Sequence, residues 1–231
     1  MSDGIRFYSA GTWSVLGIII IVCLVILVIP LLFLGFVGAA FARLGFSWIG
    51  AVAIILLMLI GGAINIPIGK IRRETVRIEY NDGVIPDGFS PWETVISLNL
   101  GGAVIPVVIA VYLLFISAPS GMLSAGSVII AVLLVSALSF ISVRHAGGAG
   151  ILAPLFIPGL AALVCGLVLS GGVGFAAGVT AFVSGTFGTL IGANIANLHK
   201  IRELGIAKFS IGGAGTFGTV FIGCILSALI V

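Results

Sequence analysis

Long apolar runs without a charged side chain dominate this sequence. The hydrocarbon core of a bilayer is about 30 Å thick, and a helix of about 20 apolar residues crosses it. Seven runs have about this length or more, so the sequence predicts a bundle of membrane-spanning helices. The predicted spans are Val15–Ala40, Phe46–Ile68, Val95–Ser117, Met122–Val143, Ile151–Ser170, Gly172–Leu198 and Phe209–Val231.

The composition agrees with this class of protein. Hydrophobic residues make up 61% of the chain and charged residues 7%, with a mean hydropathy of +1.39. A soluble domain of this composition would lack polar surface to face water. We therefore expect an all-α, polytopic transmembrane protein of the cell membrane, with residues 1–231 as a single domain. Its expected partner is the lipid bilayer, with a homo-oligomer or a larger membrane complex left open and no nucleic acid.

The basic residues predict the orientation of the chain, because cytoplasmic loops of membrane proteins are enriched in Lys and Arg. With seven spans, only Arg43 falls on one side, and the N-terminus is predicted to be cytoplasmic and the C-terminus outside. The polar cytoplasmic loop 69–94 alternates apolar and charged residues before Asn81-Asp82-Gly83, a pattern that favours a hairpin. The basic residues of the cytoplasmic side are Arg6, Lys70, Arg72, Arg73, Arg77, Arg144, Lys200, Arg202 and Lys208.

A few polar side chains interrupt the predicted spans. Unpaired amides are costly in hydrocarbon, so we expect these residues to face one another or a wet cavity on the cytoplasmic half of the membrane. Two interpretations remain open, hydrogen bonding between helices or a polar binding site. The candidate residues are Asn65, Asn99, Asn194, Asn197 and Thr216.

Small residues recur every fourth position in the last two spans. The sequence GTFGT occurs at Gly185–Thr189 and again at Gly215–Thr219. Small residues at this spacing let helices approach closely. We therefore expect the sixth and seventh spans to pack together, with little room beside Gly188 and Gly218.

A second repeat, GGAG, stands at Gly147–Gly150 and at Gly212–Gly215, before the fifth span and at the start of the seventh. Free N–H groups at helix N-termini favour anions. Pro154 and Pro158 also predict a broken or kinked fifth helix, a feature of transporter binding sites. The candidate residues for an anion or headgroup are Arg144, His145, Gly147, Gly148, His199, Lys200, Gly212 and Gly213.

Several motifs together resemble an uncharacterised family of prokaryotic multi-spanning membrane proteins, a domain of unknown function. They are INIPIG, LNLGGAVIP, GAGILAPLFIP, GTFGTLIGANIANLHKI and SIGGAGTFGTVF, and they cover most of the chain from the second span onward. The resemblance implies Asp at the position of Asn194 and Asp-Gly at Gly218-Thr219 in typical members. This chain would then lack the paired carboxylates that intramembrane aspartyl proteases need.

Three classes of function remain open. The first is a transporter or binding protein for a small anionic or polar-headed molecule, with a site that faces the cytoplasm. The second is a degenerate intramembrane enzyme, and the third is an accessory subunit of a membrane complex. We favour the first, because no span contains an acid and no hydrolase motif is present. The sequence predicts no catalytic residues, no metal site and no cofactor.

Overall fold

The computed structural model describes residues 12–72, 93–117, 119, 121, 123–146, 150–204 and 206–230. The hairpin predicted around Asn81-Asp82-Gly83 lies outside the described residues.

Each of the seven predicted spans contains an apolar helix. Four helical stretches are long and apolar enough to cross a membrane: Gly17–Arg43, Leu100–Ser117, Ala125–Ser142 and Phe175–Ile201. The three others have 12 to 14 residues, so a crossing by all seven stays a prediction. The helices are α1 (Thr12–Arg43), α2 (Trp48–Gly61), α3 (Ile105–Ser117), α4 (Ala125–Ser142), α5 (Ile157–Leu169), α6 (Phe175–Thr189), the short α7 (Leu198–Leu204) and α8 (Phe217–Ala228).

The expectation of an all-α protein is wrong, because strands stand at the ends of four predicted spans. The structure contains a three-stranded sheet in the order β1-β2-β5 and a two-stranded sheet of β3 and β4. Short apolar runs have the same hydropathy in a buried strand as in a helix, so the predicted spans extended too far. The strands are β1 (Asn65–Arg72), β2 (Glu93–Asn99), β3 (Arg144–Ala146), β4 (Gly150–Leu152) and β5 (Lys208–Ile211).

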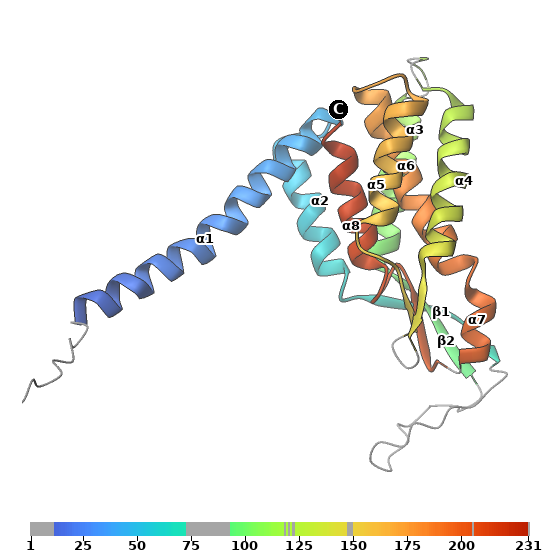
Figure 1. Cartoon of the computed structure of the whole chain (residues 1–231), viewed down its shortest axis with the longest axis horizontal. Coiled ribbons are helices and arrows are strands. Elements are labelled where there is room, and N and C mark those ends of the chain that lie inside the picture. The colour runs from blue at the N-terminus through green and yellow to red at the C-terminus, as the bar shows by residue number, and fades with distance from the viewer. Residues whose placement is uncertain are drawn as a thin grey trace, which may run out of the picture.

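The larger sheet combines both strand orientations. Strand β1 pairs antiparallel with β2, with Asn65 opposite Asn99, and β5 pairs parallel with β2. The register of β1 shifts between Pro67 and Gly69, as expected where a proline removes a backbone donor. Both sheets lie at one end of the helical bundle, with α7 beside them (Figure 1).

Helix α6 is the centre of the bundle. It packs against α3, α4, α5 and α8 (Figure 1), and nearly all its residues from Ala177 to Thr189 are buried. Glycine and alanine provide the space for these neighbours. A methyl group at Gly166 of α5 would lie 2.8 Å from the Ala181 methyl of α6. Substitution of these small residues would therefore separate the helices.

The outer surface of the bundle is apolar. Large Ile, Leu, Val and Phe side chains are exposed along α1, α2, α3, α4 and α5. Helix α1 extends away from the other helices over much of its length (Figure 1), and its side chains from Ile18 to Ile26 are exposed. An exposed surface this rich in large apolar side chains is expected to face lipid or another apolar partner, rather than water.

Candidate functional site

Two π-helical segments interrupt the helices at the end of the bundle that carries the sheets. The first, η1 (Leu100–Val104), leads into α3, and the second, η4 (Leu190–Ile195), continues α6. A π-helix displaces the regular hydrogen bonds of a helix, and such segments often occur at functional sites. In both segments, the side-chain amide of an asparagine forms hydrogen bonds with backbone groups near the irregular turn.

Asn99 organises the first of these segments. Its Oδ1 accepts a hydrogen bond from the Gly102 N–H at 2.7 Å. Its Nδ2 donates to the Gly62 carbonyl at 2.8 Å and to Asn65 Oδ1 at 3.0 Å. The hydroxyl of Ser210 also donates to Asn65 Oδ1. Asn99 thus joins the end of α2 to β1, and Asn65 links Asn99 to Ser210 of β5. Both hydrogens of the Asn99 amide have a partner.

The second segment, η4, is linked to the first through Gly212, the residue that follows β5. A methyl group built at Gly212 would lie 2.6 Å from the Gly102 carbonyl carbon, so only glycine fits there. Gly212 also has φ +73°, which favours glycine. The Gly212 N–H donates to Asn194 Oδ1 at 3.2 Å. Two residues without side chains therefore bring the two asparagine-bonded segments together.

Asn197 completes the C-terminal end of η4. Its Nδ2 donates to the carbonyls of Gly192 and Ala193, at 2.9 and 3.3 Å. Asn197, Asn194 and Asn99 are buried, whereas Asn65 is exposed. The remaining predicted residue, Thr216, is buried next to α8, and its hydroxyl donates to the Gly213 carbonyl at 3.4 Å.

The structure therefore brings some of the predicted polar residues into contact. Asn65 and Asn99 are directly bonded, and Asn194 adjoins them through Gly212 and Gly102. The hydrogen bonds of Asn65 and Asn99 join separate elements, as expected for stabilising contacts. Asn194 and Asn197 each keep one amide atom that is buried without a partner among the described residues.

The residues predicted to bind an anion do not form one group of free donors. The N–H groups of Gly212 and Gly213 already donate to Asn194 Oδ1 and to the Ser210 carbonyl. His199 is exposed on α7, with Nδ1 3.0 Å from the Ala196 carbonyl oxygen, and Lys200 Nζ lies 5.1 Å from the centre of the Phe140 ring. Gly147, Gly148 and the side chain of His145 lie outside the part of the chain that the structure describes.

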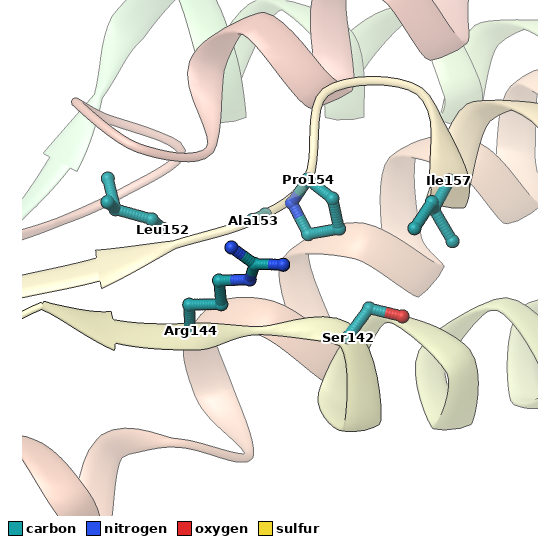
Figure 2. Close-up of a pocket in the computed structure, with 6 residues that line it drawn as sticks. All are labelled: Ser142, Arg144, Leu152, Ala153, Pro154 and Ile157. Atoms are coloured by element: carbon teal, nitrogen blue, oxygen red, sulfur yellow. The ribbon is translucent and has the colours of Figure 1, made fainter.

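Arg144 is the predicted anion-binding residue that borders a pocket. This pocket of about 430 Å³ lies where α4 ends and the segment before α5 begins. Figure 2 shows the guanidinium extending from β3 toward Ala153 and Pro154. Within the described residues, Arg144 makes no ion pair. Its exposed charge therefore stands beside largely apolar walls, which are lined by Ser142, Leu152, Ala153, Pro154 and Ile157.

The second GTFGT supports the wall of this pocket. The Thr219 hydroxyl donates to the carbonyls of Ala153 and Pro154 at 3.4 and 3.3 Å, and the Ala153 N–H donates to the Gly215 carbonyl at 2.8 Å. Helix α5 begins only at Ile157, with Pro158 in its first turn, so the expectation of a helix kinked or broken by its prolines is wrong. Pro154 lies in the nonhelical segment before it.

The glycine packing differs from its prediction in one respect. Helices α6 and α8 do pack together, as expected. However, Gly188 faces α4, where a methyl group would lie 2.7 Å from Val135 Cβ. Gly218 faces Leu155, whose side chain would lie 2.8 Å from such a methyl group. The prediction of little room is confirmed for Gly188, whereas at Gly218 only the end of the flexible Leu155 side chain is close. The expectation that these glycines serve the contact between α6 and α8 is wrong.

Sequence reasoning missed two serines of α4. Ser139 is buried and Ser136 is partly buried, and the hydroxyl oxygen of each is shielded from solvent without a partner among the described residues. Their spacing of three within an apolar run was an available signal, because such residues lie on one face of a helix.

These observations define the class of the protein. It is apolar and mostly helical, with a small sheet and four helices that are long and apolar enough to cross a membrane. Comparison with family models gives one match. The model described as "Protein of unknown function (DUF1614)" matches residues 59–230, and the chain belongs to the DUF1614 family. No curated protein and no solved structure matches the chain.

Proposed function

We propose that this protein is a membrane transporter or binding protein for a small anionic molecule with an apolar portion, which binds in the Arg144 pocket. The observation that carries this proposal is the exposed guanidinium beside apolar walls. A guanidinium binds carboxylates and phosphates through paired hydrogen bonds, and apolar walls favour a ligand that also carries hydrocarbon.

The location of the pocket supports entry from the cytoplasm. The pocket lies at the sheet end of the bundle, where the elements β1, β3, α7 and β5 carry basic residues. Helix α1 ends with Arg43 at the other end (Figure 1). Because Lys and Arg mark cytoplasmic loops, we assign the sheet end to the cytoplasm.

Binding of hexyl phosphate to the full-length protein in uncharged-lipid nanodiscs tests this proposal. A hydrogen bond to a charged group contributes about 1.5–3 kcal/mol, so Arg144→Gln should weaken binding about 10–150-fold. The matched control is Lys208→Gln, which removes the same charge from β5 outside the pocket and should bind like the wild type.

Two further ligands distinguish the contribution of the Arg144 charge to binding from that of the apolar wall. Hexanol lacks the anion, so its binding should not depend on Arg144. Inorganic phosphate lacks the hydrocarbon, so it should bind more weakly than hexyl phosphate. Equal affinity of the wild type and Arg144→Gln for hexyl phosphate would show that this pocket is not the anion site.

A further inference from the structure

The Arg144 pocket opens on the outer surface of the bundle. Leu152 and Ile157 of its lining are exposed, as is the Arg144 side chain. Helix α4 contributes its last residue, Ser142, and α5 contributes its first, Ile157 (Figure 2). The pocket is therefore continuous with the apolar surface that these two helices present.

A row of exposed apolar side chains leads away from the pocket along α5. Val164 and Val168 follow the pocket residue Ile157 by about two and three helical turns, and all three side chains are exposed. Residues at these spacings lie on one side of a helix. The exposed side of α5 thus begins at the pocket and continues toward the other end of the bundle.

A second row lies on α4, which packs against α5 and also leads away from the sheet end (Figure 1). Leu138 and Leu134 precede Ser142 at steps of about one helical turn, and both are exposed. From Leu134 to Ser142 the helix rises about 12 Å, at about 1.5 Å per residue. Half of the hydrocarbon core is about 15 Å thick, so this row covers most of one leaflet. We call Val164 and Val168 of α5 with Leu134 and Leu138 of α4 the apolar rows.

The position of Arg144 relative to α4 matches the depth of lipid headgroups. Helix α4 is long and apolar enough to cross a membrane, and Ser142 is its last residue. Arg144 follows in β3, just beyond the apolar helix. In a bilayer that α4 crosses, its end marks the edge of the hydrocarbon core, and the guanidinium stands at the level of the lipid phosphates.

The size and charge of the pocket fit one part of a lipid. Small-molecule pockets measure about 300–1,000 Å³, so a volume of about 430 Å³ encloses a phosphate headgroup and leaves an acyl chain outside. None of the described residues that line the pocket is acidic, so the cation of a choline or ethanolamine headgroup would meet Arg144 without a carboxylate partner. A headgroup with a phosphate and no positive group fits this lining better.

We propose that the ligand of the Arg144 pocket is an anionic phospholipid, which reaches the pocket through the cytoplasmic leaflet. Its phosphate binds the guanidinium, and one acyl chain lies along the apolar rows. A guanidinium bonds two phosphate oxygens at once, and basic pockets between membrane helices on the cytoplasmic side hold lipid headgroups. This inference rests on the proposed function and names its substrate class.

Photocrosslinking of the full-length protein in phosphatidylcholine nanodiscs tests this inference. The probe is phosphatidic acid with a diazirine in one acyl chain, and mass spectrometry locates the labelled residues. The label should concentrate on the apolar rows and exceed that on Val108 and Phe115 of α3, which are 61% and 79% exposed and do not line the pocket. Phosphatidylcholine with the same diazirine chain should label the two surfaces alike. Equal labelling of the apolar rows by the two probes would overturn the proposal.

Variants of the basic residues link the label to the pocket. Arg144→Gln should reduce the excess of phosphatidic acid label on the apolar rows about tenfold or more, because a hydrogen bond to a charged group is lost. Lys208→Gln, outside the pocket, should keep the excess. An excess that survives in Arg144→Gln would refute the assignment of the headgroup.

The two proposals can fail separately. Hexyl phosphate binding that depends on Arg144, without an excess of phosphatidic acid label on the apolar rows, would overturn the lipid proposal and leave the anion pocket in place. Absence of both effects would overturn both proposals. Melting temperatures of the two variants check that each one is folded.

Discussion

Replacement of Gly192 by alanine should destabilise the protein more than any other single added methyl group on α6 or η4. The methyl carbon would lie 2.8 Å from the carbonyl carbon and 2.9 Å from the Cα of Ser136, and nearer still to its carbonyl oxygen. Ordinary contacts begin at 3.4 Å. All three atoms belong to the backbone of α4, so no side-chain rotation relieves the contact and the helices must separate.

The expected loss is near the upper end of the range for overpacking, about 3 kcal/mol. For a chain of this size, it corresponds to a fall of about 6–12 °C in the melting temperature, measured in detergent. Gly126→Ala on α4 is the control, because its new methyl group has no neighbour nearer than 3.7 Å. That variant should melt at or slightly above the wild-type temperature, since alanine favours helix. A Gly192→Ala protein that melts like Gly126→Ala would refute the close approach of α4 and η4.

Two further predictions concern individual hydrogen bonds, and a third concerns the orientation of the chain. Asn99→Ala leaves the buried Gly102 N–H without its partner and should cost about 1–3 kcal/mol of stability in thermal melting, whereas an unchanged melting temperature would contradict the bonding described here. Thr219→Val removes the hydroxyl bond to Pro154 at nearly constant volume, so hexyl phosphate should bind more weakly to the loosened pocket wall, and unaltered binding would separate this wall from the site. A reporter fused after Val231 should be active only if it is a type that works outside the cytoplasm, and activity of a cytoplasmic reporter would reverse the assigned orientation.

Hydropathy located the helices but not their ends. Apolar runs predicted the positions of the four long and three shorter apolar helices, because each helix must present apolar surface along its length. Most of β2 (Glu93–Asn99) was included in a predicted span, because hydropathy does not distinguish a buried strand from a helix. Pro67 and the β-branched run around Thr94 and Val95 were local signs of strand that length and hydropathy outweighed.

The contacts of the glycines depended on tertiary structure. The spacing of small residues correctly indicated close packing, but spacing alone does not name the partner. Gly188 and Gly192 face Val135 and Ser136 of α4. No repeat of small residues in the sequence of α4 indicates this contact. The π-helical geometry of η4 was equally inaccessible, because its local sequence, LIGANI, has no turn or proline signal. Its interruption becomes visible only from the backbone bonds, such as that from the Ala196 N–H to the Ile191 carbonyl.

The two π-helices explain why polar residues occur at these positions in so apolar a chain. Backbone groups left unpaired by an interrupted helix are costly away from water, so a nearby side chain must satisfy them. Asn99 does this at η1 and uses all its amide hydrogens there, and that junction is therefore fully explained by stability. Asn197 performs the same task at η4 with its nitrogen alone, and its buried oxygen has no partner among the residues that the structure describes. Because a purely structural role does not require this second atom, stability explains η4 less completely than η1.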